Sequence, residues 1–352
     1  MRCVAYIGLS LLCINAAGAA ELGSAPLRGS RAYEAAPSYP VFPPASMASE
    51  ALPVAAVVTP VLPAYSYEVG ARYWYSTGKL SKDLYDDPRS SDLLNSRLTY
   101  DGLTAHSFEA FGRINLPSGL FLKGFAGTSG LSKGTLNDED FAFPGFPYSS
   151  TLSDQRDGKL NYAMADLGYS YAANPRANVS LFGGFGYIGE KVNAYGCTQI
   201  AANPFVCVPA IGNVLAITED AHWGLVRLGV AADVKLMDRL TLSAEAAWVP
   251  YAQINSRDSH WLRIGTTAGS FAGPIPQNAS GNGFQLEALL AYQVWDCFNI
   301  GVGGRYWRFD TRGSGDLEQT VVGFPSPTSQ PMHFLSERYG AFVQGSYKFG
   351  AM

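Results

Sequence analysis

Charged residues are scarce in this chain. Asp, Glu, Lys and Arg make up 15% of its 352 residues, against about 25% in an average soluble protein. The formal net charge is −4, and Lys and Arg do not cluster anywhere along the sequence. Without a basic patch there is no surface to attract a phosphate backbone. We therefore expect no nucleic-acid partner, and the low charge disfavours an ordinary soluble protein.

Long hydrophobic runs are also missing. A membrane-spanning helix needs roughly 18–20 consecutive apolar residues. The apolar stretch at residues 54–62 is much shorter, and Pro60 interrupts it. The sequence therefore predicts no transmembrane helix.

The first 20 residues are predicted to be a cleavable signal peptide. Arg2 supplies a positive charge, residues 4–14 form a short apolar core, and residues 17–19 are the small residues Ala-Gly-Ala. This order is typical of an export signal. The apolar core is too short for a membrane anchor, so we expect an exported chain.

Cysteines are few, as the chain has five of them and two lie in the signal peptide. Cys197 and Cys207 flank a short stretch that contains Pro204, and we expect them to form a disulfide in an oxidising compartment. Cys297 is distant from both and is expected to be a free thiol.

Two compositional regions follow the signal peptide. Residues 21–64 are rich in Ala, Pro and Ser, which predicts a disordered linker. From residue 65 onward apolar and polar residues alternate with a period of two, as in strands with one apolar face and one wet face. A soluble β-sandwich also alternates in this way. The export signal, the many tyrosines and the final Tyr347-Lys348-Phe349 favour a membrane barrel instead. The alternation is clearest at residues 240–248, 284–294 and 338–349.

The connections between these strands have two lengths. Short turns lie around Pro117, Pro175, Asp238 and Asp296. They alternate with long polar segments at about 76–105, 128–159, 191–221, 253–282 and 310–336. Five hairpins joined by four tight turns make ten strands. An exported chain without long apolar helices can cross lipid only as a closed barrel, because every backbone group needs a partner.

The predicted fold is therefore an all-β, ten-stranded antiparallel transmembrane barrel over residues 65–352. Its short turns are expected in the periplasm and its long loops outside. Several charged residues should then point into the lumen and pair there as structural elements. This set comprises Glu109, Arg113, Asp166, Arg227, Glu245 and Arg305.

Two long segments carry acidic or histidine residues at a spacing of two. Asp138 and Asp140 lie in the second segment, and Asp258 and His260 lie in the fourth. In an extended chain such residues project to the same side, and the strand count places the two segments on opposing walls. Asp258 could orient His260, whose other ring nitrogen would take a proton from water. A calcium site at the Asp pair is an alternative, and an isolated Asp-x-His is most often incidental.

The other histidines, His106, His222 and His333, are interpreted as structural residues without such partners. This leaves one Asp-His pair and one Asp pair as the candidate catalytic set. A water held between them would suit hydrolysis of a peptide bond without a metal or another cofactor.

From about residue 65 to its end, the chain resembles the omptins, the ten-stranded outer-membrane aspartyl-type endopeptidases. The likeness is clearest at residues 136–141, 157–163 and 258–260, in the family's order. It implies that Asp138 and Asp140 match the catalytic Asp pair and that Asp258 and His260 match the Asp-His pair. It also implies a peptide substrate, an active site facing the cell exterior, and dependence on lipopolysaccharide.

The sequence departs from that family at the residues that select the substrate. Family members that cleave beside basic residues carry an acid two positions before the Asp-His pair, where this chain has Ser256. No secure match exists for a second acid in the first long segment, which contains Asp83, Asp86 and Asp87. Preference for Arg or Lys is therefore not expected. Lys191 and Arg227 are loose matches for lipopolysaccharide contacts.

The sequence thus favours an omptin-like endopeptidase of the cell outer membrane. The alternative is a non-enzymatic outer-membrane barrel, such as an adhesin, a structural protein or a small channel, that keeps the fold. A channel is disfavoured because ten strands leave little space around a charged lumen.

Overall fold

The computed structural model describes residues 65–87, 90–143, 146–174, 176–323, 325 and 328–350. The predicted signal peptide and linker lie outside these residues, as does Pro175 of the second predicted turn. Over the described ranges the chain is almost entirely β-strand, with one short 3-10 helix, η1, at Glu318–Thr320. No helix within these described ranges is long and apolar enough to cross a membrane.

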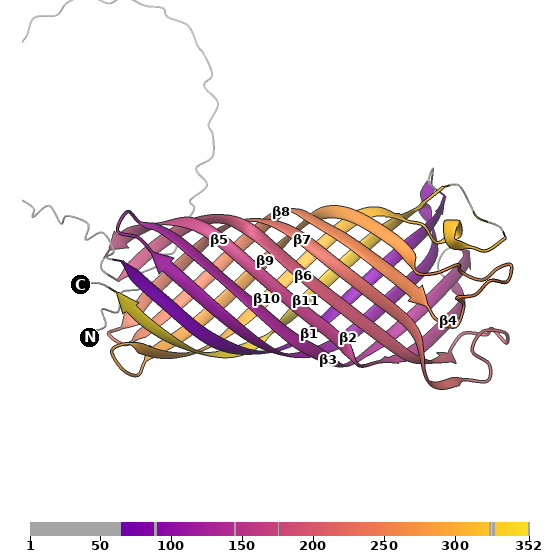
Figure 1. The fold of residues 1–352 in the computed structure, drawn as a ribbon, viewed down its shortest axis with the longest axis horizontal. Helices are drawn as coiled ribbons and strands as arrows, with labels where there is room; N and C mark the ends of the chain where they lie inside the picture. Colours follow the sequence, from indigo (N-terminus) through magenta and orange to yellow (C-terminus); the bar gives the residue numbers. More distant parts are fainter. Residues whose placement is uncertain are drawn as a thin grey trace, which may run out of the picture. The chain divides into compact units, whose positions relative to one another are not determined.

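Eleven antiparallel strands form one sheet that closes on itself (Figure 1). β1 pairs with β2 on one side and with the last strand, β11, on the other. The strands are β1 (Ser66–Asp87), β2 (Ser90–Asn115), β3 (Leu120–Phe143), β4 (Phe146–Gln155), β5 (Gly158–Asn174), β6 (Ala177–Gln199), β7 (Ile211–Met237), β8 (Leu240–His260), β9 (Ile275–Gln293), β10 (Phe298–Gly315) and β11 (Gln330–Gly350).

The barrel has ten strand positions although eleven strands are counted. β4 and β5 both pair with β3 and with β6, one beyond the other, and only residues 156–157 separate them. They therefore share one place in the ring. The prediction of a ten-stranded antiparallel barrel is confirmed, with its fourth strand interrupted.

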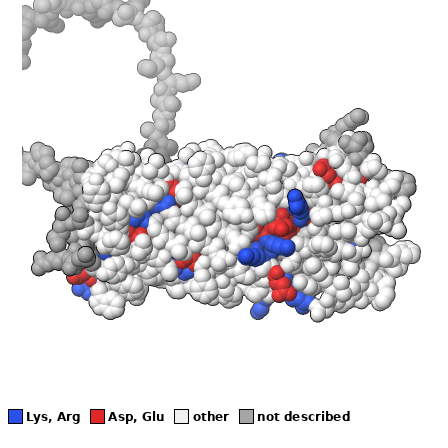
Figure 2. All heavy atoms as spheres, in the orientation of Figure 1, with Lys and Arg blue, Asp and Glu red and all other residues white. Residues whose placement is uncertain are grey.

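The period-two pattern determines which side chains face outward. On β11, Tyr339, Val343 and Tyr347 are exposed, whereas Arg338 and Phe342, each one position before an exposed residue, are buried. Figure 2 shows one side of the molecule with few Lys, Arg, Asp or Glu, and these are gathered in small groups of mixed sign. An apolar outer belt of this kind suits lipid contact.

The lumen is filled by side chains. Arg305 binds Glu109 at 2.8 Å and Glu287 at 2.7 Å, and Arg227 binds Glu245 at 3.0 Å. Beyond these ion pairs the rings of Trp74 and Trp307 meet with centroids 4.9 Å apart. The cavity beside Arg305 and Glu287 measures about 20 Å³, which is room for about one water.

The predicted network of paired lumenal charges is thus present for five of its six residues. Arg113 instead donates hydrogen bonds to Asn115 and Ser170. The network also corrects one expectation about the outer wall. Arg227 is 2% exposed and points inward, because its position in β7 has the parity of the buried residues. It cannot contact lipopolysaccharide on the wall, whereas Lys191 is exposed there.

Both ends of the barrel's chain lie at the same rim as the tight turns. Ser66 pairs with Gly350 and with Asn115, and the turns at residues 116–119, 238–239 and 294–297 close hairpins at that rim (Figure 1). The long segments differ from the expectation of loops. β1 and β2 are separated by residues 88–89 alone, so most of the first segment is strand. Backbone pairing continues because alternation persists beyond the lipid-facing belt.

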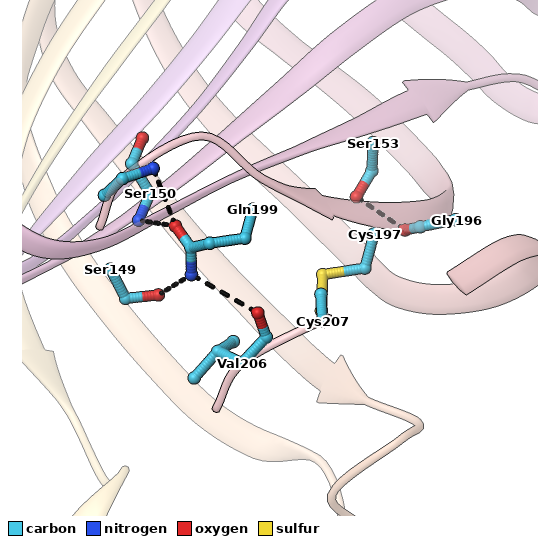
Figure 3. The surroundings of a disulfide bond; sticks show 9 residues. Ser149, Ser150, Ser153, Gly196, Cys197, Gln199, Val206 and Cys207 are labelled. Carbon is cyan, nitrogen blue, oxygen red and sulfur yellow. Dashed lines mark hydrogen bonds between the residues drawn. A yellow bond between two sulfur atoms is a disulfide. The ribbon is translucent and has the colours of Figure 1, made fainter. Parts of the chain in front are cut away.

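The predicted disulfide between Cys197 and Cys207 is present, and it joins the last residues of β6 to the segment that follows this strand. Around it, Gln199 accepts a hydrogen bond from the Ser150 amide at 2.9 Å and donates one to Ser149 at 3.1 Å (Figure 3). These bonds connect the disulfide segment to β4. The expectation of a free thiol at Cys297 was wrong, because that residue is also disulfide-bonded.

The orientation of the barrel in the membrane gives a first prediction. With the tight turns in the periplasm, a cysteine in place of the exposed Asp238 should resist a membrane-impermeant thiol reagent in intact cells. A cysteine in place of Thr266, which is exposed at the other rim, should react. Lysed cells supply the control, since both positions should then react. Labelling of the Asp238→Cys variant in intact cells would contradict the orientation.

Candidate active site

The four predicted site residues lie on strands and not in loops. Asp138 and Asp140 belong to β3, and Asp258 and His260 form the end of β8. Asp138 pairs with Leu98 of β2 and Thr151 of β4. Each pair has the parity of the inward positions, as shown by the buried Leu136 two residues before Asp138 and the buried Ser256 two residues before Asp258.

The ring order brings the two pairs to opposing walls. β3 and β8 are four positions apart in the ring of ten. On β1 and β8 the exposed aromatic residues nearest the site are Tyr75 and Tyr251. Asp258 lies seven residues beyond Tyr251, at about 3.3 Å per residue. The site is therefore outside the lipid-facing belt, at the rim far from the chain's ends.

Asp258 and His260 form a hydrogen-bonded pair. The His260 Nε2 donates to Asp258 Oδ2 at 2.9 Å, with the two side chains 12% and 3% exposed. Burial by itself would lower the pKa of His260, but the Asp258 carboxylate outweighs it and raises that pKa above its usual value. Burial would raise the pKa of Asp258, and His260 and then Lys82 hold it below its usual range.

Asp138 and Asp140 together retain a proton near neutrality. Burial, and then the neighbouring charge of Asp140, raise the pKa of Asp138 to about 7. Burial also raises the pKa of Asp140, against the opposing charges of Arg263 and His260 and a hydrogen bond with Ser96. A carboxyl that holds its proton near pH 7 can donate it, which an ordinary Asp cannot.

The two pairs influence each other across the mouth. The positive charge of His260 opposes the rise in the pKa of Asp138, and the charge of Asp138 adds to the rise in the pKa of His260. Asp140 likewise responds to His260. The charges of the four residues are therefore coupled across the mouth.

Sequence reasoning missed the cation beneath the pair. Lys82 of β1 donates to Asp258 Oδ2 at 2.6 Å and also binds Glu219 of β7. The signal was in the alternation, because Lys82 falls between the inward Leu80 and Leu84. A lysine at such a position needs a carboxylate partner.

Tyr100 lies fully buried near the same group. Its pKa is raised well above the usual value by burial and then by the charges of Asp258 and Glu219. Its hydroxyl has no hydrogen-bond partner among the residues that the structure describes.

At the positions where the resemblance would place substrate-selecting acids, the described residues include no free acid. Ser256 donates to Gln277 Oε1 at 2.9 Å inside the barrel. Asp83 lies on the outer face of β1, where Arg97 binds it at 2.7 and 2.9 Å, so it is not part of the site. The side chains of Asp86 and Asp87 lie outside the described residues. The inward residue of this segment next to Asp258 is thus the cation Lys82.

The segment after β8 folds over the His260 ring. Phe271 is buried and meets that ring edge-on, with centroids 5.6 Å apart. Arg263 lies over the Phe271 ring at 4.2 Å, and its amide donates to the His260 carbonyl at 2.8 Å. The positive charge of Arg263 also opposes the rise in the pKa of Asp140. This packing limits the orientations that the imidazole can adopt.

The remaining histidines lie on the outer wall and do have partners. His333 binds Asp310 at 2.9 Å, His222 binds Tyr187 at 2.8 Å, and His106 binds Tyr73 at 2.7 Å. The expectation that they have no acidic partner was wrong for His333 and for His222, which also lies 3.3 Å from Asp220. The partner of His106 is a tyrosine. The exposure of these histidines on the outer face separates them from the site. In the described ranges no group of three or more His, Cys, Asp or Glu is arranged to hold a metal ion.

No protein-family model and no curated protein sequence matches this chain. Among solved structures it is similar to the outer membrane protease OmpT from Escherichia coli, with 14% identity and a TM-score of 0.64 over 81% of this chain and 97% of that one. OprG from Pseudomonas aeruginosa has 10% identity and a TM-score of 0.33, over 82% and 97%. The toluene transporter TodX of P. putida has 8% identity and a TM-score of 0.29, over 82% and 91%. The chain therefore has the fold of a bacterial outer-membrane β-barrel.

Proposed function

We propose that this protein is an omptin-like endopeptidase of the outer membrane, with its active site facing the cell exterior. The observation that carries the proposal is the placement of two pairs, Asp138 with Asp140 and Asp258 with His260, on opposing walls of one mouth, where their charges act on each other. The filled lumen disfavours a channel, and the shared fold of the protease OmpT is consistent with the proposal.

In the proposed reaction a water between the pairs attacks the carbonyl carbon of a peptide. Because Nε2 of His260 is bound to Asp258, Nδ1 takes the proton of the water, and Asp258 stabilises the resulting imidazolium. Protonated Asp138 donates to the carbonyl oxygen as the tetrahedral intermediate forms. When the C–N bond breaks, His260 gives its proton to the leaving amine. Asp138 takes a proton back from a hydroxyl of the intermediate, which leaves a carboxylic acid and restores both groups. The test is cleavage of a peptide library by the refolded protein, and a protein that cleaves nothing is one of the non-enzymatic barrels.

The outer-membrane lipid is a further proposed partner. Lys191 of β6 is exposed on the wall and pairs with the exposed Lys159 of β5. Two adjacent cations just beyond the apolar belt suit the phosphates of lipopolysaccharide. The library assay therefore needs arms with and without lipopolysaccharide.

The pH dependence follows from two groups that must be in opposite states. Neutral His260 is needed to accept a proton, so the rate should rise as pH passes the raised pKa of His260. Asp138 must keep its proton, so the rate should fall above about pH 7. We expect a bell-shaped profile of kcat/KM with its maximum near neutrality.

The Asp140→Asn variant tests this assignment. It removes the like charge that helps raise the pKa of Asp138, so the falling limb should move to lower pH. A wild-type rate that keeps rising from about pH 5 to about pH 9 would contradict the role of Asp138 as a proton donor.

Cleavage should not require a basic residue beside the scissile bond. Ser256 is neutral, and the cation Lys82 reaches across from β1 to Asp258, two residues after Ser256, so a small or apolar side chain is expected there. Ser256→Asp should increase cleavage beside Arg or Lys by at least about fivefold, since one charge about 4 Å away contributes about 1–4 kcal/mol. Mass spectrometry of the cleaved peptide library measures both the preference of the wild type and the change in Ser256→Asp. A wild type that cleaves only beside Arg or Lys would exclude this specificity.

A further inference from the structure

A buried lysine joins two opposing walls beneath the candidate active site. Lys82 comes from β1, whereas Glu219 comes from β7, five positions away in the ring of ten. The side chains of Lys82, Glu219 and Asp258 are at most 3% exposed. The three groups carry one positive and two negative charges in a nearly dry environment.

This arrangement keeps Lys82 charged. Burial by itself would lower the pKa of Lys82, but Asp258 and Glu219 outweigh burial and raise that pKa. Removing one partner of such a buried group leaves an uncompensated charge, which is strongly unfavourable. Lys82 is therefore a permanent cation behind the Asp-His pair.

The contact with Asp258 involves the oxygen that also binds the histidine. Lys82 Nζ and His260 Nε2 both donate to Oδ2 of Asp258, at 2.6 and 2.9 Å. Two donors on one oxygen fix the rotation of the carboxylate. Lys82 and His260 also compete for the negative charge of Asp258. The part of this charge that Lys82 neutralises cannot stabilise a proton on His260.

Other charges around His260 act from different elements. Asp138 and Asp140 face it from β3, and Arg263 lies in the segment after β8. None of these groups contacts the Asp258 carboxylate among the described residues. Lys82 is the cation whose loss would change that carboxylate directly.

We propose that Lys82, held in place by Glu219, is a positioning residue for the Asp258–His260 pair. It fixes the carboxylate and limits how strongly that carboxylate holds a proton on the imidazole. The consequence for catalysis rests on the proposed endopeptidase function, whereas the proton equilibrium of His260 does not.

The experiment compares Lys82→Met with Glu219→Gln in the refolded full-length barrel. The pKa of His260 is measured by NMR titration of its ring, which is assigned by the signal lost in His260→Ala among the four histidines of the chain. Lys82→Met removes a positive charge from Asp258, so the pKa of His260 should rise. Glu219→Gln leaves Lys82 to Asp258 alone, so the pKa should fall. Lys82→Arg keeps the charge and should shift it least.

The kinetic readout separates positioning from substrate binding. Lys82→Met should lower kcat by about 10–100-fold, the loss typical when a residue that orients a metal ligand is replaced, and should move the rising limb of the pH profile to higher pH. KM should change little, because the Lys82 side chain is only 3% exposed. Lys82→Arg should restore most of kcat.

A second cross-barrel ion pair provides the matched control. Arg338 of β11 binds Glu190 of β6 at 2.5 Å, with both side chains buried to a similar degree. The double variant Arg338→Met/Glu190→Gln removes this pair without adding net charge. It should leave both the pKa of His260 and the pH profile unchanged.

The outcomes decide between the claims. Opposite shifts in Lys82→Met and Glu219→Gln support the proposal, whereas shifts of the same sign, or none, overturn it. If Lys82→Met does not fold, Glu219→Gln and Lys82→Arg still test the proposal. A pKa of His260 that fails to fall in Glu219→Gln also overturns the proposal. If the wild type cleaves no peptide, the endopeptidase function fails and the titration alone tests Lys82.

Discussion

The His260→Ala variant should hydrolyse peptides about 10²–10⁴-fold more slowly than the wild type, the usual loss when a general base is removed. His260 is the group that can take the proton of the water, and no other described histidine lies inside the mouth. The variant should still form the barrel. The His260 side chain makes one hydrogen bond and one ring contact, while the sheet is held by backbone pairing along every strand.

His333→Ala is the matched control for this loss. His333 also binds a carboxylate, Asp310 at 2.9 Å, but it does so on the outer wall. The His333→Ala variant should retain the wild-type rate. Turnover is measured on a peptide taken from the library, and folding by circular dichroism and heat-modifiable migration in gels. Cleavage that His260→Ala leaves unchanged would falsify the proposed role of the histidine.

The Asp258→Asn variant should lose activity to a comparable extent, on the order of 10²–10⁴-fold, as when the orienting Asp of a catalytic triad is replaced. An amide cannot stabilise the imidazolium, and its NH2 group cannot accept from both Lys82 and His260. With the carboxylate gone, burial and Lys82 both favour neutral His260, so its pKa should fall. The residual activity should therefore begin to rise at lower pH than in the wild type.

The control for Asp258→Asn is an Asp-x-His pair with the same spacing at another place in the barrel. Asp220 lies two residues before His222 on β7, with their side chains 3.3 Å apart. Asp220→Asn should keep full activity, because that pair faces outward. Equal rates for Asp258→Asn and the wild type across the pH range would rule out the Asp-His mechanism.

The barrel could be predicted because its signals are local and repeated. Side chains alternate across every strand, so lipid and lumen select opposite residue types at each step. The tight turns at Pro117, Asp238 and Asp296 marked one rim. The long segments were harder to interpret, since a polar strand beyond the lipid belt and a polar loop have similar compositions. The strands in fact continue to within two residues of each other between β1 and β2.

The candidate site was predictable in part for the same reason. Asp138 with Asp140, and Asp258 with His260, had to share a side within each extended segment, and the strand count placed the segments on opposing walls. That reasoning overlooked Asp220-x-His222, which has the same spacing as Asp258-x-His260. The two motifs differ only in parity relative to the inward positions of β8 and β7, and the long segments obscured that parity.

By itself, the sequence determined the barrel, its alternating faces, the strand count and the pairing of residues that lie two apart, because these follow from the strand period and from the need to satisfy every backbone group. Only the tertiary structure decided which charges meet across the lumen. Lys82, Glu219 and Asp258 are separated by 137 and 39 positions in the chain, and neighbouring residues do not indicate that they will meet. Strand tilt and register set their level in the barrel, and the low dielectric of the lumen makes their pairing necessary.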